Sequence, residues 1–263
     1  MLDSIALRFK TPLKSGNVGE GKAGTVSYFW GMDTESLYKS NLEKLPTDWI
    51  YRNKQIKYTT NSAGYRAQEW YKLDWANSIL VLGCSFVFGD GVDDTETIPF
   101  YMEKILGIPT INLGAGGASQ LWLLHNSTIL YENYPCPKAI VFVWPDQSRV
   151  LRYNNFQPAR ESVWNGNQLN SYFEQYNRNR NPEAMAYFNR LLAKNLWKDR
   201  CIFYDISYND DVSMITGCDY WPLEARNPNN DISLAARDGK HLNHIANQIV
   251  AEQISKNLQG QGL

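Results

Sequence analysis

The feature that most constrains the fold is a series of short apolar runs that alternate with helical patterns from Ser78 onward. Each run is apolar without alternation, as expected for a strand buried on both faces of a parallel sheet. Strands that alternate with helices predict such a sheet, covered by helices on both sides. We therefore expect an α/β fold, a three-layer α/β/α sandwich with a flavodoxin-like parallel sheet of about five strands. The pattern predicts strands at 78–83, 108–114, 138–144 and 200–207, and helices at 93–107, 119–134, 181–197 and 241–260.

Two of the predicted helices also indicate which side chains should face the core. Periodic apolar positions mark the inner face of an amphipathic helix. On the helix at 181–197, Asn181 is the expected N-cap and the apolar face is formed by Tyr187, Phe188, Leu191 and Leu192. On the closing helix, the side chains expected to be buried are Leu242, Ile245, Ile249 and Leu258.

Residues 1–75 differ from the rest of the chain in composition and in hydrophobic pattern. They are rich in Lys, Tyr, Asn and Gly, and they contain few regular patterns apart from a short helix between Asp33 and Pro46. We interpret 1–75 as an irregular N-terminal extension that packs on one main domain, residues 76–263. A second stretch without regular patterns, Ser148–Arg180, is expected to be rich in loops.

Charge and cysteine content exclude several classes of function. The formal net charge is −1, which provides no basic field for a nucleic-acid backbone. No apolar run approaches the length of a membrane span, and the N-terminus does not resemble a secretory signal, so a cytoplasmic protein is expected. Four scattered cysteines without C-x-x-C spacing predict no metal site and no disulfide framework. No cofactor is implied.

Ser85 directly follows the first predicted strand, at the edge of the sheet where ligands of such folds bind. The α/β-hydrolase motif G-x-S-x-G is absent, because Val87 stands where the second glycine belongs. A serine nucleophile needs a base, and Asp238 and His241 form D-x-x-H just before the closing helix. The alternative is that Ser85 only closes a tight turn, Asp238 is an N-cap and His241 is a first-turn residue.

Together these segments resemble the SGNH hydrolases, also called GDSL esterases and lipases, over residues 78–258. The first block of that family, Gly-Asp-Ser with a later glycine, is similar to Gly83–Cys84–Ser85 and Gly89. The second block, an Asn followed by a glycine of the oxyanion hole, is similar to "NLGAGGAS", with Gly117 in the glycine position. The last block, Asp-x-x-His, is similar to the segment from Asp238 to His241. The segment "NSAGYR" at 61–66 resembles one found in some phage and bacterial SGNH proteins, so a phage-encoded member is one interpretation.

The resemblance has two departures. Cys84 replaces the aspartate of the first block. In the third block, usually Gly-x-Asn-Asp, Val143 replaces the glycine and Pro145 the asparagine, whose amide would donate to the oxyanion. Loss of one such donor costs about 10²–10³ in rate. Gln147 is a candidate substitute donor; alternatively, the amides of Ser85 and Gly117 suffice.

The resemblance implies a serine esterase in which Ser85 is the nucleophile, His241 the base and Asp238 the residue that orients it. Activity is then expected to rise around pH ~6–7, where histidine loses its proton. A thiol nucleophile, Cys84, is a minor alternative. The 9 Trp and 16 Tyr favour an O-acetyl or similar ester on a carbohydrate as the substrate. The competing hypothesis is a catalytically weak or inactive SGNH-fold protein with a carbohydrate-binding or virion-structural role. A homo-oligomer, a virion partner or association with a virion is compatible with either hypothesis.

Overall fold

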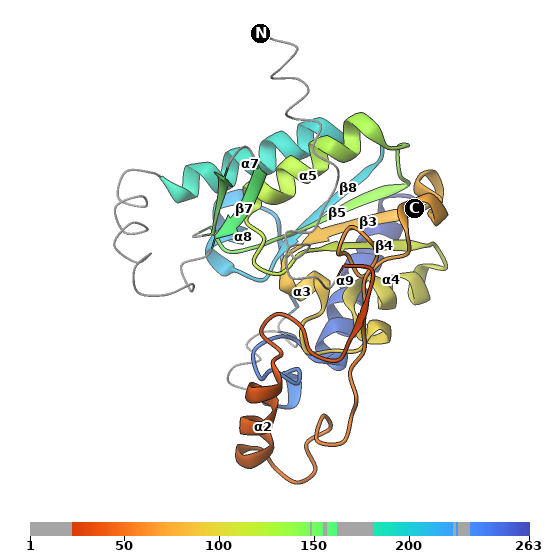
Figure 1. Ribbon diagram of the computed structural model, residues 1–263. Coiled ribbons are helices and arrows are strands. Elements are labelled where there is room, and N and C mark those ends of the chain that lie inside the picture. Colours follow the sequence, from red (N-terminus) through yellow and green to blue (C-terminus); the bar gives the residue numbers. More distant parts are fainter. Residues whose placement is uncertain (1–22, 148, 155–156, 162–180, 223–224, 226–231) are drawn as a thin grey trace.

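The computed structural model describes residues 23–147, 149–154, 157–161, 181–222, 225 and 232–263 (Figure 1). Its main sheet has five parallel strands in the order β4-β3-β5-β8-β9. The bounds are β3 Ile79–Gly83, β4 Thr110–Gly114, β5 Ala139–Trp144, β8 Ile202–Ser207 and β9 Asp219–Tyr220. Counted along the chain, the order is 2-1-3-4-5, which is that of flavodoxin-like sheets. The predicted sheet is therefore confirmed.

Helices cover both faces of this sheet (Figure 1). On one face lie α5 Gln120–Asn133 and α7 Pro182–Trp197, and on the other lie α4 Ile98–Leu106 and α9 His244–Gly260. Successive residues of a strand point to opposite faces. Accordingly, Leu80 and Leu82 belong to the apolar cluster under α5, whereas Ile79 and Val81 belong to the one under α9. The three-layer α/β/α prediction is confirmed.

Local sequence explains where the helices begin and end. The predicted caps Ser119 and Asn181 are confirmed, because their side chains accept hydrogen bonds from Trp122 N at 3.2 Å and Ala184 N at 2.9 Å. The helix predicted at 93–107 is divided: a 3-10 turn, η4 Asp94–Glu96, precedes α4. Short helical elements complete the described chain: α8 Asp210–Thr216, η2 Trp70–Lys72, η3 Trp75–Asn77 and η6 Ile232–Leu234.

The expected inner faces of two helices are partly wrong. On α7 the predicted apolar face is exposed, with fractions of 39–56% for Tyr187, Phe188, Leu191 and Leu192. A different face of α7 is buried, and it carries Ala186, Asn189, Ala193 and Trp197. Leu242 and Leu258 are buried and Ile249 is partly buried, as expected, but Ile245 on α9 is 46% exposed. Asn243 caps α9, which places Leu242 before the helix and turns Ile245 outward.

The chain before β3 carries its own apolar cluster. It contains α2 Glu35–Lys44, which confirms the predicted short helix, and a small antiparallel pair, β1 Val26–Ser27 with β2 Tyr58–Thr59. Side chains of this segment pack on the main fold through Phe88, Val92 and Ala236. The partners on the segment are Trp30, Trp49, Tyr51, Ile56 and Tyr58. The division of the chain at residue 75 stays a prediction.

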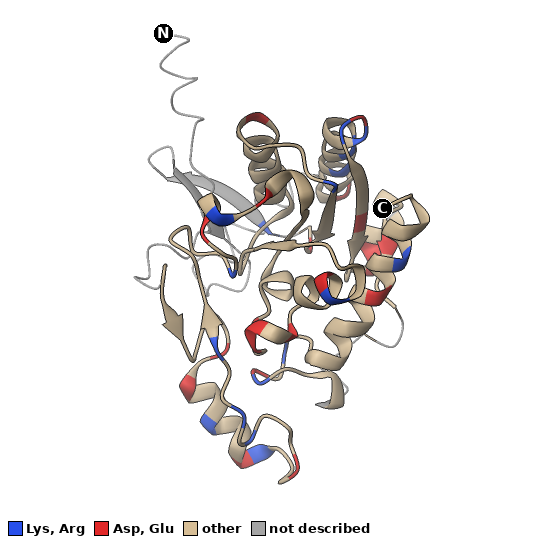
Figure 2. Cartoon of the chain, turned by 90° about the vertical axis from the view of Figure 1, so that its right-hand side faces the viewer, with Lys and Arg blue, Asp and Glu red and all other residues tan. Residues whose placement is uncertain are grey.

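Between β5 and α7 the sequence predicted loops. The structure instead has an antiparallel hairpin there, β6 Val150–Asn154 with β7 Gln157–Glu161, so that prediction is wrong for these residues. Most of the remaining stretch, 162–180, lies outside the described residues. Over the described part of the fold, charged residues of both signs are interspersed (Figure 2). None of the helices described is both long and apolar enough to cross a membrane.

Candidate active site

Glycines shape the turn that presents Ser85 at the carboxyl end of β3. A Cβ on Gly83 would collide with the side chain of Val87, and a Cβ on Gly114 would collide with the backbone of Phe88. The short helix α3 Ser85–Phe88 can therefore pack directly against β4. Since the strand order reverses between β3 and β5, Ser85 lies at the topological switch point, where ligands of such sheets bind.

His241 joins Ser85 to Asp238, although 156 residues separate the serine from the histidine. His241 Nε2 lies 2.8 Å from Ser85 Oγ, and His241 Nδ1 contacts the carboxylate of Asp238. All three residues are buried, with exposures of 5% for Ser85, 8% for His241 and 2% for Asp238. The arrangement allows His241 to take a proton from Ser85 while Asp238 holds the ring.

A tight turn fixes Asp238 and His241 relative to each other. Asp238 Oδ1 accepts hydrogen bonds from the backbone N–H groups of Lys240 and His241, both at 3.0 Å. The turn is closed by a bond from Ala236 N to His241 O at 2.8 Å. The N-cap of α9 is Asn243, so the alternative interpretation of Asp238 as a helix cap is wrong.

Burial and neighbouring charges shift the pKa values of this pair apart. Burial alone would raise the pKa of Asp238, but the charge and hydrogen bonds of His241 hold it below its usual value. Burial would lower the pKa of His241, but Asp238, Asp90 and Cys84 raise it to about 9. The proposed role of His241 as a base therefore predicts a rise in activity near pH 9 rather than at pH 6–7.

Asp90 is a buried acid near this pair that the sequence analysis missed. It is 2% exposed, and burial raises its pKa to about 6. Its Oδ2 accepts one long hydrogen bond, from Met32 N at 3.5 Å, and its Oδ1 has no hydrogen-bond partner in the described part of the chain. The signal in the sequence was the aspartate between two glycines, Gly89 and Gly91.

We expect an alkaline pH profile, because His241 must be neutral to accept a proton. With a pKa of about 9, kcat/KM should rise about a hundredfold from pH 7 to the plateau above pH 9. Asp90→Asn removes a negative charge that raises this pKa, so the profile should move to lower pH. Asp211→Asn, at an exposed position on α8, is the control and should leave it unchanged. An unmoved profile in Asp90→Asn would show that Asp90 does not act on His241.

The predicted oxyanion-hole residues lie at the same edge of the sheet. Gly117, half-buried with φ of 70°, follows β4 in a turn closed by Ala118 N to Ala115 O at 3.0 Å. Gln147 is half-buried beyond β5, and its Oε1 has no hydrogen-bond partner among the residues described. No hydrogen bond links Gln147 to Ser85 or Gly117 within that part of the structure, and its role stays a prediction.

Neither Val143 nor Pro145 of the third block carries a side-chain donor. Val143 is fully buried in the core, and the carbonyl of Pro145 accepts a bond from Gln120 Nε2 at 3.0 Å. Cys84 is also fully buried, in the apolar cluster on the α5 side, whereas Ser85 faces His241. This geometry favours the serine over the thiol.

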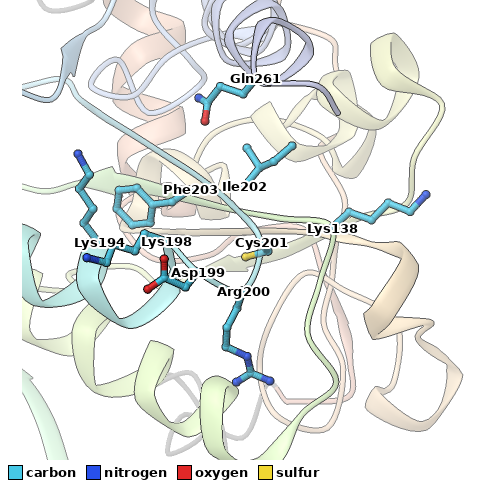
Figure 3. Close-up of a pocket in the computed structure, with 9 residues that line it drawn as sticks. All are labelled: Lys138, Lys194, Lys198, Asp199, Arg200, Cys201, Ile202, Phe203 and Gln261. Carbon is cyan, nitrogen blue, oxygen red and sulfur yellow. The ribbon is translucent and has the colours of Figure 1, made fainter.

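A surface pocket of about 620 Å³ lies elsewhere, at the amino ends of β5 and β8, beside Lys138 and Cys201. Figure 3 shows Lys138 and Lys194 on opposite sides of it. Ser85 stands at the carboxyl end of the sheet, so this pocket is not part of the candidate site. Within the described ranges no group of three or more His, Cys, Asp or Glu side chains could hold a metal ion.

Solved structures similar to this chain include the psychrotrophic esterase EstA from Pseudoalteromonas sp., with TM-score 0.44, 12% identity, and coverage of 70% of this chain and 98% of that chain. Another is a carbohydrate esterase family 2 enzyme from Corynascus thermopiles (Myceliophthora fergusii). Its TM-score is 0.43 at 11% identity, and the match covers 70% of this chain and 66% of that chain. A third is Est24, a carbohydrate acetylesterase from Sinorhizobium meliloti, with TM-score 0.41 and 12% identity. That match covers 70% of this chain and 99% of that chain. No protein-family model and no curated protein matches the chain. The function proposed below rests on the site itself.

Proposed function

We propose that this chain is a serine esterase of the SGNH type. The observation that carries the proposal is the chain of contacts from Ser85 Oγ through the His241 ring to the Asp238 carboxylate. A buried serine hydroxyl paired with a buried imidazole, itself held by a carboxylate, has the geometry of an activated nucleophile.

In the proposed reaction, Ser85 Oγ attacks the ester carbonyl carbon while His241 Nε2 takes the hydroxyl proton. The backbone amides of Ser85 and Gly117 donate to the oxyanion that forms. Collapse of the tetrahedral intermediate breaks the bond to the alcohol, which receives the proton from His241. Water, deprotonated by His241, then attacks the carbonyl carbon of acyl-Ser85. The second tetrahedral intermediate collapses with cleavage of the Ser85 Oγ–acyl bond, His241 returns the proton to Ser85 Oγ, and the acid is released. Asp238 stabilises the imidazolium in both halves.

We propose a short acyl ester of a carbohydrate as the substrate. The ring centroid of half-buried Phe86 lies 4.9 Å from that of His241, and the half-buried Tyr208 ring lies 4.6 Å from Phe86. The Trp221 ring, 5.2 Å from Phe86, is only 2% exposed and packs behind Phe86. Aromatic rings with a polar tip suit contact with the apolar face of a sugar and with its hydroxyl groups.

A fluorophosphonate probe tests the proposal directly, because it forms a covalent bond only with a nucleophilic serine. We expect labelling at Ser85 and faster hydrolysis of p-nitrophenyl acetate than of p-nitrophenyl octanoate. Acetylated xylan should release acetate. Absence of labelling and of turnover on every ester, with retained binding to a glycan, would instead support the inactive binding or virion-structural hypothesis, which Pro145 at the asparagine position favours.

A further inference from the structure

Arg149 lies in the loop after β5, close to both segments that carry the proposed oxyanion amides. Its Nη1 donates to the carbonyl of Ala118 at 3.4 Å, and Ala118 directly follows Gly117. The side chain of Cys84, which directly precedes Ser85, is among the groups that raise the pKa of this guanidinium. The cation therefore lies at the residue that follows Gly117 and within electrostatic range of Cys84.

One N–H group of the Arg149 guanidinium is available to donate to a ligand. Its Nε is buried and has no hydrogen-bond partner among the described residues. Burial, the largest influence, would lower the pKa of Arg149, but Cys84, Tyr208 and Asp146 outweigh it and raise the pKa, so the group stays charged. A buried N–H without a partner is costly, and a ligand oxygen would satisfy the Nε of this half-buried side chain.

Arg149 comes from the same loop that lacks a side-chain donor at Pro145. We propose that Arg149 is a catalytic residue whose guanidinium donates to the oxyanion, in the role left open by the absent asparagine. The inference rests on the proposed esterase function. A charge-assisted hydrogen bond to an oxygen that becomes negative strengthens as the transition state forms, so it acts mainly on kcat.

The test uses p-nitrophenyl acetate, which is neutral and presents no anionic group to a cation. We expect Arg149→Ala to lower kcat by about 10²–10³ with little change in KM. Guanidinium chloride at concentrations well below those that unfold the protein should restore part of the kcat of Arg149→Ala, but none of that of Ser85→Ala. Arg149→Lys, which keeps the charge but loses the planar fork, should fall between the two and covers the case in which the alanine variant does not fold.

Gln147→Ala tests the competing donor, and Arg200→Ala is the control. Gln147 is in the same loop, and its loss should change kcat far less than the loss of Arg149. Arg200 donates to Tyr131 O at 3.0 Å and stacks on the Tyr131 ring near the other edge of the sheet, so its loss should leave kcat unchanged. A 10²-fold loss in Gln147→Ala together with normal kcat in Arg149→Ala would overturn the proposal.

Labelling by a fluorophosphonate separates failure of this inference from failure of the proposed function, because the phosphoryl oxygen of the probe enters the same oxyanion hole. If wild-type Ser85 is labelled and Arg149→Ala or Arg149→Lys is labelled equally fast, only the role of Arg149 is refuted. If wild-type Ser85 is not labelled, the esterase itself is refuted, and Arg149 with it. An effect of Arg149→Ala confined to KM for anionic esters would show a substrate-binding role and would also overturn the proposal.

Discussion

Ser85→Ala is expected to reduce ester hydrolysis by on the order of 10⁶-fold, or to the uncatalysed background. The hydroxyl at 2.8 Å from His241 Nε2 is the nucleophile of the first step of the proposed reaction, and no acyl-enzyme can form without it. The measurement is the rate of p-nitrophenyl acetate hydrolysis, together with loss of fluorophosphonate labelling.

Cys84→Ala is the matched control, because this thiol is adjacent in the chain and fully buried. It should retain measurable turnover and labelling, although loss of its contact with Arg149 is expected to slow the reaction. Thermal unfolding should show that both variants are folded. Equal activity in Ser85→Ala and the wild type would refute the nucleophile assignment.

The largest expected effect on stability belongs to Asp33→Asn. The Asp33 carboxylate pairs with the Arg237 guanidinium, with Nη2–Oδ2 at 2.6 Å and Nε–Oδ1 at 2.9 Å. Their side chains are 0% and 3% exposed, and Tyr58 donates a third bond to Asp33 at 2.6 Å. Removal of the negative charge leaves a buried cation without compensation, which should lower the free energy of unfolding by about 3–5 kcal/mol.

Urea unfolding of Asp33→Asn and of Glu35→Gln measures this difference. Glu35 pairs with Lys39 at 2.7 Å on the exposed surface of α2, where an ion pair contributes little, so Glu35→Gln should resemble the wild type. A double variant that replaces Asp33 and Arg237 with apolar residues should recover much of the loss. Similar unfolding of Asp33→Asn and Glu35→Gln would show that the buried pair does not stabilise the fold.

The same pair joins the N-terminal segment to the turn that carries Asp238. Arg237 immediately precedes Asp238, its backbone N–H donates to Gly91 O at 3.1 Å, and Asn41 Nδ2 donates to its carbonyl at 2.9 Å. Figure 1 shows this part of the chain beside α2. Sequence analysis described residues 1–75 as an irregular extension and gave no reason to connect Asp33 with a residue 204 positions later.

Local sequence determined the parts of this protein that depend on neighbouring residues. Apolar runs and caps predicted the strands and most helices, because burial on both faces and the first N–H groups of a helix impose residue types at short range. The D-x-x-H spacing placed Asp238 and His241 together for the same reason, since one turn brings the carboxylate to the ring.

Only the tertiary structure decided what depends on distant segments. The strand order brought Ser85 to His241, and burial of a different face of α7 left its apolar stripe exposed. The fold also buried the Asp90 carboxyl near His241, brought Arg149 to the residue after Gly117, and paired Asp33 with Arg237. Electrostatic influence acts through space and depends on burial, and neither property can be read from the spacing of residues along the chain.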